Sequence, residues 1–481
     1  MCRVIVIILI LSAVTVGLYT LGAIGPSITV SEEFGLKDCD IALGSLGYPF
    51  ISTDSCEANG GQLLSENYRD TVPSDRGRHL YYLTVPVKRT HRIMSRWYQY
   101  LLADLNVVLK PDYIKKMKEA GPSLIVYEVA IGYRDDSESD WQLLSSGNSS
   151  RILECVPNDW GVLICDHFPL FELWSVYHKH YIINMRFLWL PIVSDYPTDN
   201  SVIKEMSLME IHQNPQFTYV WFILKTVFFS LSFLSFAYSY NKRKLSLYHK
   251  SLLVLNVSLL FFNMPVEWFS LLIDVPWITL LNDLRQGLLT LVIMIFWTLV
   301  INNHDVQESG IQSVIHSLVF ASLTALGLLV YELCERGIQV FLPFYSLWGS
   351  SYGRGLIYVS VGVASISCIL YIISLVINFV KIRRKIHNKL EGVANSNKGK
   401  LLQGLNEHLL ITIFTAVAGL CGYILPVEVF LLHGFHGNTD LSLYGAITVG
   451  NYGLWNCYIF IVTFLSSSTV TGYKILSASD E

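Results

Sequence analysis

Charged side chains occur inside several long apolar runs in the second half of the chain. Glu267, Asp283, Arg285, Glu335 and Arg336 lie near the ends of such runs. Ionisable groups are costly inside a membrane, where they normally face a water-filled cavity or a charged partner. Two arrangements are therefore open. These groups line a polar vestibule at one end of a helical bundle, or they sit at the lipid headgroups as local pairs, Asp283 with Arg285 and Glu335 with Arg336.

Patterns typical of catalysis do not accompany these charges. The chain has no His-Glu-x-x-His zinc pattern, and its apolar runs hold no pair of aspartates. The formal net charge is −4, with 34 basic and 38 acidic residues, so no basic field points to nucleic acid. We expect a protein that is not an enzyme and that needs no metal and no cofactor.

The composition predicts a protein that lies largely in a membrane. Hydrophobic residues make up 52% of the 481 residues, charged residues make up 15%, and the mean hydropathy is +0.43. A soluble domain carries about 25% charged residues, so the surplus apolar surface must face lipid. The later runs predict seven membrane spans, at about 217–239, 251–273, 280–301, 312–333, 355–380, 409–431 and 443–465.

Basic loops set the expected orientation of these spans. Lys242-Arg243-Lys244 follows the first of the seven spans, and a basic stretch at residues 381–400 follows the fifth. Such loops normally stay in the cytosol. The segment before the first span and the loops at the opposite ends are therefore expected on the lumenal side. We expect a transmembrane domain at residues 216–466 and a short cytosolic tail at residues 467–481.

The N-terminal segment, residues 1–29, holds another long apolar run. It has enough uncharged residues to cross a bilayer core of about 30 Å, and we expect an uncleaved transmembrane anchor. A cleaved signal peptide is the alternative, because the small residues in Leu21-Gly-Ala-Ile-Gly resemble a cleavage site.

Residues 30–215 are predicted to form a β-sandwich in the lumen. Runs rich in aromatic and β-branched residues recur at about 80–87, 124–133, 161–165 and 181–190, separated by turn-forming residues. The four cysteines of this segment are Cys39, Cys56, Cys155 and Cys165. They allow three pairings, and the short spacings favour Cys39–Cys56 and Cys155–Cys165. Asn148-Ser149-Ser150 is a glycosylation sequon, which we place in a polar loop.

Specific strings in this chain resemble the Wntless family, also called Evenness interrupted. They keep their order and spacing from about residue 95 to residue 466. They include Tyr133-Arg134-Asp135-Asp136, Ser175-Val176-Tyr177-His178-Lys179, Ile211-His212-Gln213-Asn214, Pro265-Val266-Glu267-Trp268-Phe269-Ser270, Asp283-Leu284-Arg285-Gln286-Gly287, Cys334-Glu335-Arg336-Gly337-Ile338-Gln339, Pro343-Phe344-Tyr345-Ser346-Leu347-Trp348 and Tyr452-Gly453-Leu454-Trp455-Asn456-Cys457-Tyr458.

The resemblance implies a lumenal β-sandwich on eight transmembrane helices, of which the last seven are arranged like a G-protein-coupled receptor. It implies a cargo receptor, not an enzyme, that binds palmitoleoylated Wnt and escorts it to the cell surface. The expected partners are Wnt proteins, membrane lipids, retromer and clathrin adaptors. The expected locations are the Golgi, endosomes and plasma membrane, reached through the endoplasmic reticulum.

On this hypothesis the acyl chain enters the helical bundle while the Wnt polypeptide rests on the vestibule. The residues expected to line that vestibule are Glu267, Trp268, Asp283, Arg285, Glu335, Arg336, Phe344, Tyr345, Trp348, Tyr452 and Trp455. The alternative function is a seven-helix signalling receptor with a β-rich ectodomain, although the last span lacks the Asn-Pro-x-x-Tyr pattern typical of such receptors.

One family motif is altered in this chain. Better-known members carry Tyr-Glu-Gly-Leu, a clathrin-adaptor signal, in the third cytosolic loop, and the matching stretch here is Leu390-Glu391-Gly392-Val393, without the tyrosine. The tail offers Tyr473-Lys474-Ile475-Leu476, which fits the same rule of a tyrosine followed three residues later by a bulky apolar residue. Tyr473 and Leu476 are therefore the candidate sorting signal.

Overall fold

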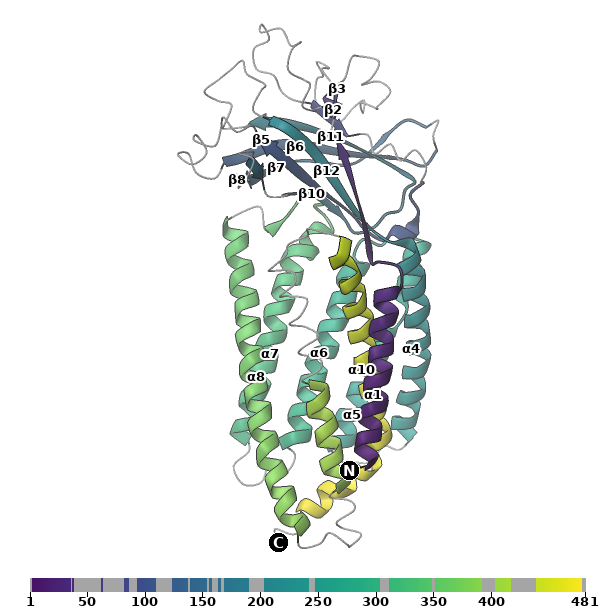
Figure 1. The fold of residues 1–481 in the computed structure, drawn as a ribbon, viewed down its shortest axis with the longest axis vertical. Helices are drawn as coiled ribbons and strands as arrows, with labels where there is room; N and C mark the ends of the chain where they lie inside the picture. Colours follow the sequence, from purple (N-terminus) through teal and green to yellow (C-terminus); the bar gives the residue numbers. More distant parts are fainter. Residues whose placement is uncertain are drawn as a thin grey trace.

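The computed structural model shows a β domain at one end of a helical bundle (Figure 1). It describes residues 2–35, 37–38, 62–63, 82–85, 93–109, 123–136, 139–153, 155–157, 163–165, 168–189, 203–241, 247–302, 311–347, 351–391, 403–416 and 438–477.

Two antiparallel sheets form the β domain. The first has the order β1 (Thr29–Gly35), β12 (Ile203–Gln213), β5 (Leu101–Leu109), β9 (Leu163–Cys165) and β8 (Cys155–Pro157), with β10 (Phe168–Leu173) also paired to β5. The second has the order β3 (Gln62–Leu63), β2 (Lys37–Asp38), β4 (Tyr82–Val85), β11 (His180–Trp189), β6 (Ser123–Arg134) and β7 (Gln142–Leu153). The expected β-rich region is thus present, and the four predicted runs fall on β4, β6, β9 and β11.

The core of this domain follows from the alternation of residues along each strand. Leu101, Ala103 and Leu105 of β5 and Tyr127 and Val129 of β6 alternate with less buried neighbours and pack into one cluster. Strand β7 gave no such signal because its sequence, Gln-Leu-Leu-Ser-Ser-Gly-Asn-Ser-Ser-Arg-Ile-Leu, is rich in serine. It lies at the edge of its sheet, where it has only one neighbouring strand and fewer of its side chains need to be apolar.

The pairing of β1 with β12 brings the entry and exit of the β domain together. β1 follows the first helix, and β12 leads directly into α4. The Asn214 N–H donates to the Ile28 carbonyl at 2.8 Å, which joins the residue before β1 to the residue after β12. The chain therefore leaves and re-enters the bundle at one place, although about 180 residues separate the two points.

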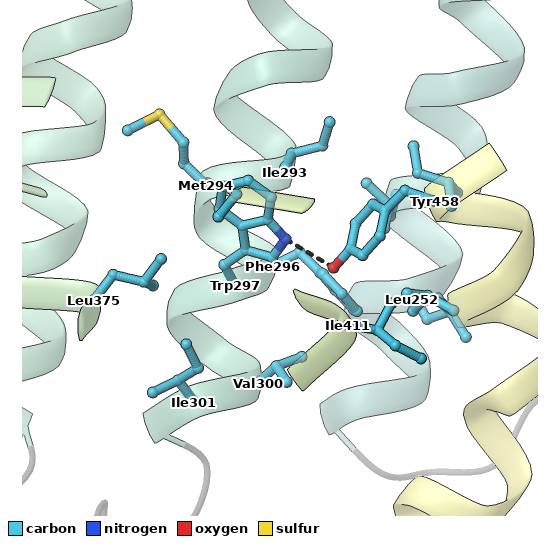
Figure 2. Close-up of a cluster of buried hydrophobic side chains, with 14 of the residues drawn as sticks. Leu252, Ile293, Met294, Phe296, Trp297, Val300, Ile301, Leu375, Ile411 and Tyr458 are labelled. Atoms are coloured by element: carbon cyan, nitrogen blue, oxygen red, sulfur yellow. Dashed lines mark hydrogen bonds between the residues drawn. The ribbon is translucent and has the colours of Figure 1, made fainter. Parts of the chain in front are cut away.

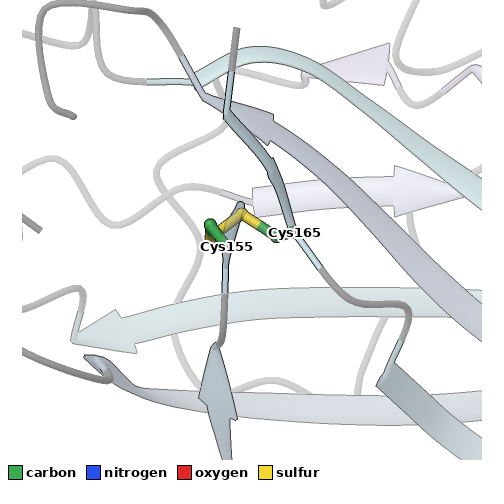
Figure 3. Close-up of a disulfide and its surroundings, with 2 residues drawn as sticks. All are labelled: Cys155 and Cys165. Carbon is green, nitrogen blue, oxygen red and sulfur yellow. A yellow bond between two sulfur atoms is a disulfide. The ribbon is translucent and has the colours of Figure 1, made fainter. Parts of the chain in front are cut away.

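One of the two expected disulfides lies within the described residues. Cys155 of β8 and Cys165 of β9 are directly opposite each other and are bonded (Figure 3). This pairing confirms the prediction from the ten-residue spacing. Cys39 and Cys56 lie outside the described residues. Asn148 is exposed, but it belongs to strand β7, so its placement in a loop was wrong.

Five helices are long and apolar enough to cross a membrane, counted over the described residues: Pro215–Asn241, Tyr248–Leu271, Ile278–Ile301, Val314–Gly337 and Tyr352–Asn388. The corresponding α-helices are α4 (Pro215–Asn241), α5 (Leu247–Asn263), α6 (Ile278–Asn302), α7 (Ile311–Glu332) and α8 (Ser351–Glu391). They match the first five of the seven predicted spans. Helices α1 (Cys2–Ile24) and α10 (Asn438–Ser477) cover the predicted anchor and the seventh predicted span. A helical stretch at residues 403–416 covers only the start of the sixth, and residues 417–431 lie outside the described part of the chain.

Helix α10 does not stop where the tail was expected to begin. It continues to Ser477, so residues 467–477, expected as part of a short tail, are helical. Figure 1 shows α1 beginning and α10 ending at the end of the bundle opposite the β domain.

Glycines bring α1 and α10 into close contact. A Cβ atom built on Gly445 would lie 2.8 Å from the Gly22 carbonyl oxygen, and one on Gly22 would lie 2.5 Å from the Gly445 oxygen. One turn further along, Gly450 faces the ring of Tyr19, whose hydroxyl donates to Asn451 Oδ1 at 2.7 Å. Small residues allow membrane helices to approach closely enough for extensive van der Waals contact. The N-terminal helix is therefore an integral part of the bundle.

The Gly445→Leu substitution should separate α1 from α10, because its side chain must displace the backbone of Gly22. We expect a loss of about 1–3 kcal/mol, seen as a lower thermal midpoint of the detergent-solubilised protein. Gly362→Leu on α8 is the matched control, because nothing lies within 4 Å of its Cβ position. Equal melting of the two variants would contradict the close contact.

Candidate functional site

Helix α5 breaks just before the β domain. α5 ends at Asn263, and the chain passes through Pro265 into the 3-10 turn η4 (Val266–Leu271). Proline has no N–H and cannot continue a helical ladder, so carbonyl groups before it need other donors. Arg285 of α6 supplies them: its Nη1 lies 2.6 Å from the Met264 oxygen and 3.4 Å from the Phe261 oxygen. Irregular backbone at membrane depth persists only when it is satisfied in this way.

The same arginine belongs to a buried charge cluster, formed by Lys225, Glu267 and Arg285. Glu267 Oε1 accepts a hydrogen bond from Arg285 Nη2 at 2.6 Å and another from Lys225 Nζ. The three residues are only 4%, 3% and 1% exposed, respectively. Two cations and one carboxylate give a formal charge of +1. Glu267 is therefore the carboxylate that bonds to both cations away from water.

A second ionic group lies nearby and is more open to solvent. Arg336 bonds to Asp283 of α6 through Nη1, and its Nε lies 3.6 Å from Glu332 Oε2. Its guanidinium also stacks over the ring of Trp174 in the β domain, 5.0 Å from the centroid. Local pairing of Asp283 with Arg285, and of Glu335 with Arg336, was wrong. Helix neighbours one or two positions apart point in different directions.

The β domain holds the turn that follows α5. Arg96 of the 3-10 turn η1 (Arg96–Tyr98) donates from Nη1 to the carbonyls of Leu271 and Leu272, both at 2.8 Å. Its guanidinium lies 3.8 Å from the centroid of the Tyr177 ring. Ser175 Oγ donates to Asp274 Oδ1 at 2.5 Å. Residues 264–277 are thus fixed by the β domain as well as by Arg285.

The turn between α7 and α8 is held in the same manner. Phe344 is buried in the core cluster of the β domain and contacts the position of Gly147. Arg151 of β7 donates from Nη2 to the Phe344 carbonyl at 2.8 Å. The Glu172 N–H of β10 donates to the Pro343 carbonyl, also at 2.8 Å. We call residues 264–277 and 338–347, with the β-domain residues that contact them, the domain junction.

Glu335 organises the bundle side of this second turn. It lies in the π-helical segment η5 (Leu333–Gly337) and accepts the Leu347 N–H through Oε2 at 2.8 Å. Gln339 donates to Glu335 Oε1 at 3.2 Å and to the Tyr345 carbonyl at 3.1 Å, and it accepts from Trp174 Nε1 at 3.0 Å. This buried carboxylate therefore fixes backbone rather than facing an open cavity.

A polar network continues from the junction into the bundle between α4, α5 and α10. Tyr452 donates to Asn263 Oδ1 at 2.7 Å, and Asn263 donates to Ser232 Oγ and to Asn456 Oδ1, both at 2.6 Å. Further along the same interface, Asn256 donates to Thr463 Oγ1 at 3.0 Å. All of these side chains are buried, so their hydrogen bonds tie the three helices together.

The interior of the bundle is largely apolar around α6, α8 and residues 403–416. Figure 2 shows Leu252, Ile293, Met294, Phe296, Trp297, Val300, Ile301, Leu375, Ile411 and Tyr458 in this cluster. The Trp297 indole donates to the Tyr458 hydroxyl at 2.7 Å, so both polar tips are paired. Trp455, one of the predicted vestibule residues, packs partly buried against this cluster.

Comparison with known proteins gives the family. Residues 214–467 match the family model described as "Wntless-like, transmembrane domain", and residues 52–213 match "Wntless, GOLD domain". The chain belongs to the Wntless family. The resemblance inferred from the short strings is thereby confirmed, and the family identity implies a multi-pass membrane protein with a role connected with Wnt secretion.

Relatives in insects and an amphibian cover most of the chain. It is 28% identical to Protein wntless of Drosophila ananassae over 431 residues, 84% of this chain and 76% of that protein. It is 29% identical to Protein wntless of Drosophila virilis over 432 residues, 84% of this chain and 76% of that protein. Protein wntless homolog B of Xenopus laevis is 29% identical over 399 residues, 77% of this chain and 72% of that protein.

The structure of this Wntless-family chain separates the predicted vestibule residues into two groups. Those that are buried are Glu267, Arg285, Glu335, Phe344 and Tyr452. Those that are exposed or partly exposed are Trp268, Asp283, Arg336, Tyr345 and Trp455. Trp348 lies outside the described residues. Of the buried members, Glu267, Arg285, Glu335 and Phe344 hold the two turns of the domain junction, and Tyr452 belongs to the polar network inside the bundle.

Sequence reasoning missed several members of the site. Lys225 was overlooked, although it is the one charged residue in the apolar run 217–239 and intramembrane charge is itself a signal. Arg96 and Arg151 lie in the β domain, where an arginine is unremarkable, so no local pattern could single them out. Metal-ligating groups of three or more His, Cys, Asp or Glu residues do not occur in the described part of the chain.

Glu267→Gln should strongly destabilise the protein, because it leaves Lys225 and Arg285 buried without a carboxylate. Breaking a buried ion pair costs about 3–5 kcal/mol, which should appear as a lower thermal midpoint in detergent. The double variant Lys225→Met with Glu267→Gln keeps the formal charge at +1 and should recover part of the loss.

Glu332→Gln is the matched control for this experiment. Its carboxylate is partly exposed, and Arg336 retains Asp283, so the expected change is within about 1 kcal/mol. Melting of Glu267→Gln at the wild-type temperature would show that the buried cluster does not stabilise the bundle.

The domain junction should make the protein less stable as pH rises. Burial raises the pKa of Glu172 to about 7, and the Glu335 and Asp104 carboxylates act in the same direction. Burial also raises the pKa of Asp104 to about 6. The folded state therefore binds more protons than the unfolded state between about pH 4.5 and 7, so stability is lost as pH rises through that window.

Melting curves of the full chain from pH 5 to 8 would measure this dependence. Glu172→Gln stays neutral throughout, so its melting temperature should fall less with pH than that of the wild type. The assignment would be refuted if the wild-type melting temperature rose from pH 5 to 8 and that of Glu172→Gln changed with pH by the same slope.

Proposed function

We propose that this chain binds a lipid-acylated Wnt protein in the secretory pathway and escorts it to the cell surface. The match to the Wntless family over both domains is the observation that carries this proposal. The protein works as a cargo receptor and performs no chemical step, so it needs no cofactor. Its partners are palmitoleoylated Wnt and membrane lipids.

The acyl chain is the reason that a carrier is needed. A buried methylene contributes about 0.8 kcal/mol to membrane attachment, so a 16-carbon chain represents on the order of 10 kcal/mol. A secreted protein with such a chain stays on the bilayer unless another apolar site shelters the chain. The apolar cluster around α6 and α8 offers surroundings of this kind.

The topology that we propose has eight transmembrane helices. Residues 1–29 form an uncleaved anchor, residues 30–215 a lumenal β-sandwich, residues 216–466 the seven-helix domain and residues 467–481 the cytosolic end. The glycine contact between α1 and α10 supports retention of the anchor, because cleavage would expose the glycine face of α10. An N-terminal sequence of the purified protein that begins after Gly25 would overturn this point.

The Wnt polypeptide contacts the accessible side of the domain junction. Trp268, Asp283, Arg336 and Tyr345 are at least partly exposed there, whereas Glu267, Arg285 and Glu335 act indirectly by holding the two turns. The acyl chain lies toward α6 and α8, and away from the hydrogen-bonded interface of α4, α5 and α10. Apolar side chains there can make room for it as long as the Tyr371 hydroxyl keeps its hydrogen bond to the Met294 carbonyl.

Binding should depend on the acyl group and on the accessible junction residues. Wnt that cannot be acylated should co-purify several-fold less with the full chain than acylated Wnt. Tyr345→Ala should weaken co-purification without lowering the amount of folded protein. Ile366→Ala, on a lipid-exposed position of α8, is the control. Equal recovery of acylated and non-acylated Wnt would refute shelter of the acyl chain. Loss of the Wnt response in receiving cells, with normal Wnt release from producing cells, would favour a signalling receptor.

The carrier cycles between the Golgi, plasma membrane and endosomes after passage through the endoplasmic reticulum, with retromer and clathrin adaptors. We propose Tyr473 and Leu476 as its endocytic signal. Both lie in the last turns of α10, so that an adaptor that reads an extended chain must unwind this end.

Tyr473→Ala should slow uptake from the cell surface, measured by surface biotinylation at matched expression. Tyr473→Phe removes only the hydroxyl and should slow uptake to a similar degree if that hydroxyl is read. Unchanged uptake of Tyr473→Ala would exclude the tail as the sorting signal.

A further inference from the structure

The end of α8 away from the β domain changes abruptly from apolar to basic on its exposed surface. Val376, Ile377 and Val380 are 42%, 50% and 39% exposed, as expected of side chains that face lipid. The next exposed positions are Lys381, Arg383 and Arg384. Such a switch marks the level where a helix leaves the hydrocarbon and reaches the headgroups.

The turn that carries these cations is held firmly by the bundle. Ile382 and Ile386, one helical turn apart, are only 4% and 2% exposed. They belong to the same buried cluster as Leu405 and Leu409 of the stretch at residues 403–416. The helix therefore continues past the membrane boundary with one face docked, and its cations cannot swing away from the headgroup level.

The three cations have no counter-ion among the residues that the structure describes. Within the described residues, Lys381, Arg383 and Arg384 form neither a hydrogen bond nor an ion pair. Lys381 and Arg384 are three positions apart and thus lie on one side of the helix, whereas Arg383 is two positions from Lys381 and points in a different direction. Loop basicity explains why such charges stay in the cytosol, but it does not require them to stand on a helical turn that is docked against the bundle.

We propose that Lys381, Arg383 and Arg384 form a binding site for phosphorylated inositol lipids of the cytosolic leaflet. A guanidinium binds a phosphate through two parallel N–H donors, so Arg384 beside Lys381, with Arg383 on the next exposed face of the same turn, suits a headgroup with several phosphates. A single-charge lipid such as phosphatidylserine can engage only part of the set. This assignment rests on the orientation proposed above, in which the basic end of α8 is cytosolic.

The test is native mass spectrometry of the full chain in detergent, titrated with short-chain phosphatidylinositol bisphosphate, phosphatidylserine or phosphatidylcholine. The wild type should bind the bisphosphate lipid at least tenfold more tightly than the other two. Each cation near a membrane surface contributes roughly fivefold in affinity. The triple variant Lys381→Gln, Arg383→Gln, Arg384→Gln should therefore bind roughly 100-fold more weakly.

Two further variants separate charge from geometry and from folding. Arg383→Lys with Arg384→Lys keeps the charge but loses the paired donors, so it should fall between wild type and the triple variant. Lys179→Gln removes one exposed charge from the β domain and should bind like wild type. All variants should melt at the wild-type temperature, because the substituted side chains are exposed.

Three results would overturn the proposal: equal binding of all three lipids, unchanged binding by the triple variant, or full displacement of the lipid by inorganic phosphate alone. The last result would show a general anion site instead of a lipid site. The assay does not involve Wnt and does not depend on membrane orientation. A failure of the cargo proposal would therefore leave this result standing, and the reverse also holds.

Discussion

Capture of backbone carbonyls by arginine is the interaction on which the junction depends. Arg285 satisfies carbonyls where α5 breaks, Arg96 satisfies those at the end of η4, and Arg151 satisfies that of Phe344. A guanidinium carries five donors in a fixed plane and stays charged, so it can replace several missing N–H groups. Without these donors, two irregular turns at the top of a membrane bundle would leave polar groups unpaired at about 1–3 kcal/mol each.

The origin of the three arginines explains how the β domain and the bundle are coupled. One comes from α6, and the other two come from the β domain, so each turn of the junction is shared between the domains. Phe344 adds an apolar contact in the opposite direction, from a bundle turn into the sandwich core. A partner that contacts the β domain is thus only a few side chains from the groups that position the helix ends.

The sequence predicted the β-rich domain, the five clear spans, the disulfide and the family, because each depends on local pattern or on strings in register. It did not predict the ionic pairing. Arg285 meets Glu267 and Arg336 meets Asp283 across helices, and such partners depend on helix rotation rather than spacing. Strand β7 was missed because an edge strand tolerates serine. Phe344 was expected to line the vestibule, since no local signal shows that an aromatic residue of a loop fills the core of another domain.

The distribution of hydrogen bonds inside the bundle limits where an acyl chain can lie. Between α4, α5 and α10, an inserted chain would separate Asn263 from Ser232, Asn456 and Tyr452, and each buried group left unpaired costs about 1–3 kcal/mol. Next to α6 and α8, where the Tyr371 hydroxyl donates to the Met294 carbonyl, a chain that leaves this hydrogen bond intact would exchange contacts with Ile293 or Leu375 for equivalent apolar contacts, with little loss of dispersion energy. The polar interface therefore serves as the fixed half of the bundle. The apolar half is the part that can repack around a lipid without a large cost in free energy.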